Sequence, residues 1–97
     1  MSRVVRSRAA ARDLGQIWDY IAEDDPDAAD RVLSRIEDRA RIDADFPQSG
    51  SLRSELGGGV RSFAVGNYLV FYRAIPDGIR LLRVLNASRD IRKAFRG

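Results

Sequence analysis

The spacing of hydrophobic residues changes from a helical period to a strand period along the chain, and this change divides the sequence into two halves. From Ala9 to about Glu23 the apolar residues recur three or four positions apart, as on one face of an amphipathic helix. Ser7, just before this segment, has the side-chain oxygen that an N-cap needs. The pattern therefore predicts a first helix with an apolar stripe made of Leu14, Ile17, Trp18 and Ile21.

A second helix is predicted to begin at Asp25-Pro26, because an Asp N-cap followed by Pro at the first helical position favours helix initiation. Its end is expected before Phe46-Pro47. The apolar face of this helix consists of Ala29, Val32, Leu33, Ile36 and Ala40. Two antiparallel helices joined by a few residues form an αα-hairpin, and the shared apolar face of this hairpin needs a sheet to cover it.

Strand patterns precede and follow the two helices. The predicted strands are residues 3–7, 60–65, 68–75 and 79–86. The last three are joined by Gly66-Asn67 and by the Pro-Asp-Gly turn at 76–78, which are typical of tight hairpins. We therefore expect an antiparallel meander, in which the nearly all-apolar segment Tyr68–Tyr72 is central and buried on most of both faces.

Two further segments are a predicted loop and a predicted terminal helix. Residues 47–59 form a predicted loop that ends in three consecutive glycines, and the Lys-Ser/Thr pair of a phosphate-binding P-loop is missing after them. A connection into the first hairpin is the better interpretation. At the other end, Ser88 and Asp90 are a candidate cap and a first-turn acid for a short terminal helix that runs through Phe95.

The predicted order of elements is β-α-α-β-β-β-α. It indicates an α+β fold in which the helical hairpin packs on one face of a small, largely antiparallel sheet. A chain of 97 residues has room for one modest core, so we expect a single domain over residues 1–97.

Composition narrows the possible functions. The sequence contains no Cys and no His, so it lacks thiolate nucleophiles, sulfur-ligated metal sites, the commonest general base and the commonest metal ligand. We therefore expect no metal, no cofactor and no catalytic constellation. No apolar run approaches the length of a membrane span, and the first residues lack the apolar core of a signal peptide. The expected location is the cytoplasm.

Charge is distributed unevenly along the chain. The net charge of +3 combines a net +4 over residues 1–12, a net −7 over 13–45 and a net +6 over 46–97. The acidic middle fits a solvated helix face. The basic end coincides with the predicted sheet, where a small structure has few places to distribute its arginines, and this favours binding of an acidic partner.

The arginines of the strand half are the first candidate site. Arg61, Arg73 and Arg83 lie one on each successive strand, and Arg89 follows the sheet. If their pleat phases agree, they converge on the sheet face opposite the helices and bind carboxylates or phosphates through charge-assisted hydrogen bonds. Phe63 alternates with Arg61, giving a mixed face that a partner would cover. The alternative is that each Arg pairs locally or keeps the face soluble.

Aromatic and acidic residues offer weaker candidates. Tyr68 and Tyr72 are expected in the core of the central strand, and Glu55 is the lone carboxylate in the loop before the basic strands. This chemistry argues against a nuclease. Trp18 and Tyr20 on the first helix are candidates for a base-stacking platform. The favoured interpretation is structural, with Trp18 in the core and Tyr20 packed under the loop.

Several motifs in order resemble the ParE branch of the ParE/RelE toxin superfamily of toxin–antitoxin modules. They cover nearly the whole chain and are A-x-x-D-L-x-x-I-W-D-Y-I-A (residues 10–22), D-P-x-A-A (25–29), P-x-x-G-x-x-R-x-E-L (47–56), G-V-R-S-F-A-V-G-N-Y-L-V-F-Y-R (59–73) and R-V-L-x-x-x-R-D-I (83–91). The RelE/ParE-like fold of this superfamily agrees with the predicted β-α-α-β-β-β order.

The resemblance implies a toxin that a small ParD-like antitoxin neutralises by wrapping an extended and helical segment over it, as a hetero-oligomer. It also implies inhibition of DNA gyrase, with contact to operator DNA only indirectly through the antitoxin. The alternative is a RelE-like ribosome-dependent mRNA endonuclease that uses Arg61 and Arg83 on the phosphate. The family often has His where this chain has Asn86, which favours the non-catalytic inhibitor. The expected contact residues are Arg61, Phe63, Arg73, Arg83, Asn86 and Arg89.

Overall fold

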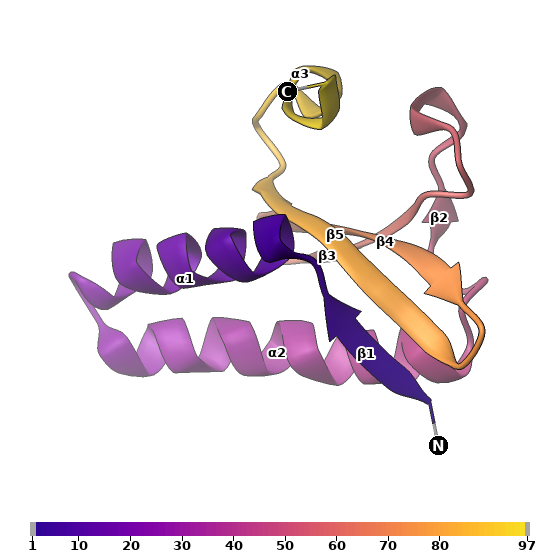
Figure 1. The fold of residues 1–97 in the computed structure, drawn as a ribbon. Coiled ribbons are helices and arrows are strands. Elements are labelled where there is room, and N and C mark those ends of the chain that lie inside the picture. The colour runs from indigo at the N-terminus through magenta and orange to yellow at the C-terminus, as the bar shows by residue number, and fades with distance from the viewer. Residues whose placement is uncertain (1, 97) are drawn as a thin grey trace.

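The fold has two layers, a helical hairpin and a five-stranded mixed sheet (Figure 1). The computed structural model describes residues 2–96, with side chains described for residues 2–95. The elements in chain order are β1 (Arg3–Arg6), α1 (Arg8–Ala22), α2 (Pro26–Asp45), β2 (Ser51–Leu52), the 3₁₀ turn η1 (Ser54–Leu56), β3 (Arg61–Val65), β4 (Tyr68–Ile75), β5 (Gly78–Asn86) and α3 (Ile91–Arg96). The α+β architecture predicted from the sequence is confirmed.

The two long helices begin at the predicted caps. The Ser7 hydroxyl accepts a hydrogen bond from the backbone N–H of Ala10, and the Asp25 carboxylate accepts one from Ala28. In each case the side chain satisfies a backbone donor that the first helical turn leaves free. The second helix ends at Asp45, directly before the predicted break.

The sheet has the strand order β1-β5-β4-β3-β2. β3, β4 and β5 form the predicted antiparallel meander, with β4 at the centre, and β1 adds to the outer edge of β5 in parallel. The loop after α2 contains more structure than expected, because β2 pairs with β3 and the turn η1 follows it. At the C-terminus, the Asp90 carboxylate accepts from the N–H of Lys93, whereas Ser88 bonds to Asn86 and does not cap α3.

The main core lies between the helices and the sheet. It consists of Ala10, Leu14, Ile36, Ala40, Ala44, Phe63, Val65, Val70, Tyr72, Ile79, Leu81 and Val84. A second, smaller cluster lies on the opposite face of the sheet, where Val60, Phe71 and Leu85 are buried beneath η1 and α3. Within the part of the chain that the structure describes, no helix combines the length and the apolar character needed to cross a membrane.

The phenol of Tyr72 joins the core to the loop after α2. Its hydroxyl accepts a hydrogen bond from the N–H of Gly50 and donates one to the carbonyl of Pro47, both at 2.9 Å. A Cβ on Gly50 would collide with this hydroxyl, so only glycine allows the backbone to approach so closely. Burial raises the pKa of Tyr72 above its ordinary value of 10.0.

Tyr72→Phe is expected to destabilise the fold by about 1–3 kcal/mol, because the buried Gly50 N–H loses its acceptor. Since the folded-state pKa of Tyr72 is raised, its contribution to stability is complete below about pH 10 and is lost as pH rises through the folded value. Urea unfolding at neutral pH and along an alkaline series measures both effects. The exposed Tyr20→Phe is the matched control. If Tyr72→Phe lost stability with rising pH as the wild type does, the alkaline loss of stability would not come from Tyr72.

Candidate functional site

A hollow lined by five charged residues lies between α1, the second half of β5 and α3, and we call it the α1 groove. Its larger part has a volume of about 660 Å³, and an adjoining hollow of about 250 Å³ shares Asp13, Gln16 and Arg89 with it. The larger part is lined by Ala9, Arg12, Asp13, Gln16, Arg73, Leu82, Arg83, Arg89, Ala94 and Phe95. The adjoining hollow adds Ile17, Tyr20, Tyr68, Val84, Leu85 and Asn86.

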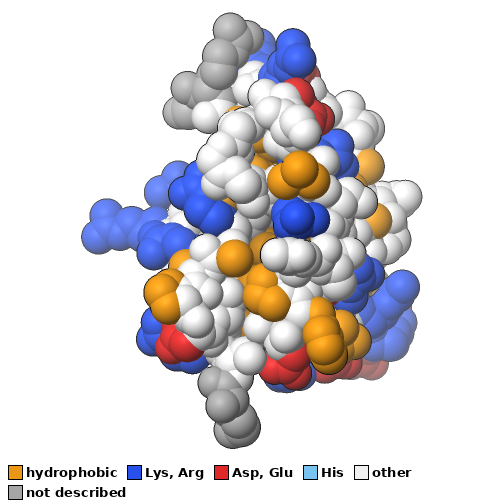
Figure 2. Space-filling view, turned by 90° about the vertical axis from the view of Figure 1, so that its right-hand side faces the viewer, with side chains coloured by type: hydrophobic (Ala, Val, Ile, Leu, Met, Phe, Trp, Pro, Cys, Tyr) orange, Lys and Arg blue, Asp and Glu red, His pale blue; other side chains and the backbone are white. Residues whose placement is uncertain are grey.

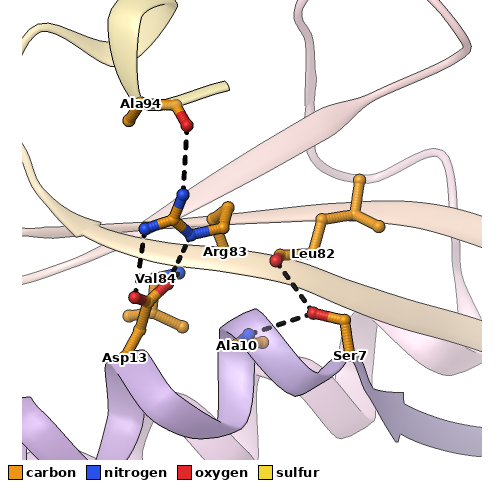
Figure 3. Close-up of polar contacts among 7 residues, drawn as sticks. All are labelled: Ser7, Ala10, Asp13, Leu82, Arg83, Val84 and Ala94. Carbon is orange, nitrogen blue, oxygen red and sulfur yellow. Dashed lines mark hydrogen bonds and ion pairs between the residues drawn. The ribbon is translucent and has the colours of Figure 1, made fainter. Parts of the chain in front are cut away.

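The groove exists because β1 is shorter than β5. β1 pairs with β5 only as far as Leu81, where the chain turns away into α1. The free edge of β5 is then satisfied by groups at the start of α1. The Ser7 hydroxyl donates to the carbonyl of Leu82, and the N–H of Val84 donates to the carboxylate of Asp13 at 2.9 Å (Figure 3). Side chains at the start of α1 therefore form the hydrogen bonds to β5 that a neighbouring strand would otherwise form.

The floor of the groove is an ion pair between α1 and β5. The Arg83 guanidinium donates to both oxygens of Asp13, from Nε at 2.8 Å and from Nη2 at 3.2 Å, in the bidentate geometry that favours Arg–carboxylate pairs. Its Nη1 donates to the carbonyl of Ala94 in α3. Figure 3 shows that Arg83 thus connects three elements. The hydrogen bonds with Asp13 raise the pKa of Arg83 above its ordinary value.

A register irregularity in the sheet puts Arg83 in this position. Tyr72 lies opposite Leu81, but its neighbour Phe71 lies opposite Arg83, so Leu82 is an extra residue in β5. Without this bulge Arg83 would share the helix-facing side of Val70. The extra residue directs it to the other face, at the free edge, where it reaches Asp13.

The structure brings four of the six expected contact residues together. Arg73, Arg83, Asn86 and Arg89 all line the α1 groove. Within it, Asn86 is exposed and its side-chain oxygen accepts from both the N–H and the hydroxyl of Ser88.

The expectation that Arg61 and Phe63 share this face is wrong. Arg61 lies opposite Tyr72, on the helix-facing side, where its guanidinium donates to the carbonyls of Gln48 and Gly50. Phe63 is only 4% exposed and packs in the main core, with Arg39 over its ring. Side chains alternate across a strand, so Arg61 and Phe63, two residues apart, lie on the same face, and that face is the helix-facing one.

The groove also contains residues that the sequence reading did not select. Arg12 projects from α1 at one end, and Tyr20 lies at the other, 74% exposed and not packed under a loop as predicted. Trp18 is half-buried, with its indole N–H bonded to Asp30. The i, i+4 spacing of Arg12, Gln16 and Tyr20 puts them on one helix face, which is the signal that could have identified them.

The α1 groove suits a partner segment with both acidic and apolar side chains. Among the described side chains, Arg12 and Arg89 form no ion pair and both are exposed. Arg83 is already bonded and therefore shapes the floor. The adjoining hollow offers apolar surface from Ile17, Tyr20 and other residues. A mixed surface of this kind is typical of protein–protein interfaces with Tyr and Arg contacts.

Comparisons with known proteins agree on one family. Residues 4–91 match the family model described as "ParE toxin of type II toxin-antitoxin system, parDE". Among curated proteins, the chain is 32% identical over 92 residues to Toxin ParE3 of Caulobacter vibrioides, covering 94% of this chain and 92% of that protein. It is 36% identical over 83 residues to the putative toxin Y4kP of Sinorhizobium fredii, covering 84% and 83%.

A solved structure has the same fold. The chain resembles a protein in the structure titled "Chromosomal ParDE TA system from P. aeruginosa", with a TM-score of 0.73 and 23% sequence identity. The likeness covers 91% of this chain and 98% of that one. The sheet and the helical hairpin that frame the α1 groove therefore belong to an established architecture.

Proposed function

The chain belongs to the ParE toxin family of type II toxin–antitoxin systems, and on that premise we propose that it inhibits DNA gyrase until a ParD-like antitoxin covers its α1 groove. The observation that carries the proposal is the family match, which begins within β1 and includes all of α1 and β5. The groove adds a surface of the right chemistry for the antitoxin.

The antitoxin is proposed to lay one segment along α1. Its acidic side chains bind Arg12 and Arg89, and an apolar side chain enters the adjoining hollow beside Tyr20. The solved relative whose title names a ParDE system supports a ParD-type partner for this chain. The resulting assembly is a hetero-oligomer, and in it the antitoxin contacts operator DNA.

Gyrase is favoured over the ribosome by the position of the two arginines that an endonuclease would use. Arg61 lies opposite Tyr72 and Arg83 lies opposite Phe71, so the pleat directs them to different faces of the sheet. Each guanidinium is also engaged in hydrogen bonds, Arg61 to loop carbonyls and Arg83 to Asp13. A single phosphate in a transition state needs donors that converge on it.

Expression of the chain in a bacterial host, with and without its antitoxin, tests this proposal. DNA synthesis is expected to stop before protein synthesis, with an induced DNA-damage response, and co-expression of the antitoxin should prevent both effects. Purified protein should also inhibit supercoiling by gyrase in vitro. Early loss of translation, with new transcript ends at fixed codon positions, would instead support the endonuclease.

A further inference from the structure

Two arginines lie side by side on the sheet face opposite the long helices. Arg73 in β4 and Arg80 in β5 are direct cross-strand partners, and both are exposed. Like charges at such positions repel each other and destabilise a sheet. Among the side chains that the structure describes, neither arginine forms an ion pair. The pair therefore concentrates positive charge without an internal counterion.

The surroundings of this pair contain a third arginine. The Nε of Arg73 donates to the carbonyl of Gly58, which fixes the direction of its side chain. Arg53 lies over the ring of Phe71 on the same face, donates to Ser62 and forms an ion pair with Glu55 at 3.7 Å. Figure 2 shows Lys and Arg side chains across the middle of the side of the molecule toward β2, with acidic side chains toward its upper and lower ends. We call Arg53, Arg73 and Arg80 the sheet-face arginines.

The kind of partner follows from what accompanies these charges. The large hydrophobic side chains with the greatest exposure are Tyr20, Ile42, Phe46 and Leu52. Tyr20 belongs to α1, Ile42 and Phe46 to α2 and its C-cap, and Leu52 lies opposite Arg61 on the helix-facing side. The apolar side chains near the sheet-face arginines, among them Val5, Leu82 and Phe95, are only partly exposed. The exposed surface contributed by Arg73 and Arg80 is therefore dominated by charge, as in a surface that binds phosphates.

We infer that the sheet-face arginines bind the phosphate backbone of duplex DNA directly and without sequence preference. Guanidinium groups on a rigid sheet bind phosphates through charge-assisted hydrogen bonds, and contacts to the backbone carry no sequence information. Arg73 also lines the larger part of the α1 groove, so the two surfaces adjoin, whereas Arg80 lies outside the groove lining. The contact with DNA needs neither the antitoxin nor gyrase. It would add a direct contact where the sequence led us to expect DNA only through the antitoxin.

Fluorescence anisotropy with two unrelated labelled duplexes of about 20 base pairs, titrated between about 50 and 200 mM salt, tests the inference on the full chain. Phosphate contacts from Arg73 and Arg80 predict a slope of log K against log [salt] of about −2, because Arg53 already has Glu55 as a counterion. Arg73→Glu/Arg80→Glu should weaken binding to both duplexes about tenfold or more and reduce the slope by about 2. Arg31→Glu/Arg35→Glu on α2 makes the same change of net charge and should leave the slope unchanged.

Folding is monitored by thermal melts of both variants. Arg80→Glu alone faces Arg73 with an opposite charge, so it should melt at or above the wild-type temperature and still lose DNA affinity. Equal losses in the α2 control would overturn the inference, because net charge alone would then explain them. So would tighter binding of a single strand than of the duplex. Retained DNA binding together with lost antitoxin binding would assign the face to a protein partner and also reject it.

Discussion

Asp13→Ala is expected to lower the free energy of unfolding by about 3 kcal/mol, because it leaves two groups without an acceptor. The Arg83 guanidinium loses its bidentate partner, and the N–H of Val84 at the free edge of β5 loses the carboxylate that accepts its hydrogen bond. This expected loss of stability is at the lower end of the range for breaking a buried ion pair, because the Arg83 side chain retains 24% exposure. In a domain of this size the melting temperature should fall by about 15 °C.

A series of variants separates the charge from the hydrogen bonds. Asp13→Asn keeps one carbonyl acceptor and should lie between wild type and Asp13→Ala. Asp13→Leu/Arg83→Met replaces the pair by apolar groups and should recover part of the loss, since the unpaired cation is removed as well. The control is Asp19→Asn, exposed on the same helix. Urea denaturation measures all four. Equal stabilities of wild type and Asp13→Ala would show that the ion pair does not hold α1 to the sheet.

Reversing the charges of Arg12 and Arg89, two groove arginines that form no ion pair among the described side chains, should have the largest effect on binding. Arg12→Glu/Arg89→Glu is expected to weaken the complex with the cognate antitoxin by roughly a hundredfold, because each substitution replaces attraction by like-charge repulsion. Much of the loss should appear as slower association, since exposed charges at the margin of an interface act on encounter. Surface plasmon resonance at two salt concentrations measures both rate constants.

The same charge change elsewhere controls this experiment. Arg31→Glu/Arg35→Glu on α2 should retain wild-type affinity within about twofold, since neither residue lines the groove. A Tyr20→Ala variant probes the apolar part of the groove and should accelerate dissociation with little effect on association. If the groove reversal and the α2 reversal behaved alike, the antitoxin would bind another surface.

Local signals in the sequence were sufficient for the elements. Ser7 and Asp25 cap the helices they were expected to cap, and the two-residue connection Gly66-Asn67 joins the strands it was expected to join. These features depend on a few neighbouring residues, so one sequence contains the information. Tyr72 was correctly expected in the core of the central strand for the same reason.

The faces on which the candidate residues lie depend on strand register, which the sequence pattern predicts only in part. A two-residue turn that pairs Val65 with Tyr68 already places Arg61 opposite Tyr72, so counting back from the turn could have separated Arg61 from Arg73. The position of Arg83 could not be counted in this way. The bulge at Leu82 shifts the register of β5, and that bulge is stabilised by Asp13, a residue far away in the sequence.

The parallel pairing of the first strand with the last has a consequence for folding during synthesis. A ribosome releases β1 and both long helices well before β5, yet β1 can join the sheet only by pairing with β5. Pairings between residues far apart in the sequence tend to form late, because the entropy of closing a long loop is lost before the contacts can stabilise the structure. We therefore expect the α1 groove to form only after β5 has joined the sheet. A nascent or truncated chain that ends before β5 presents no groove, so an antitoxin that recognises this surface distinguishes finished toxin from unfinished toxin.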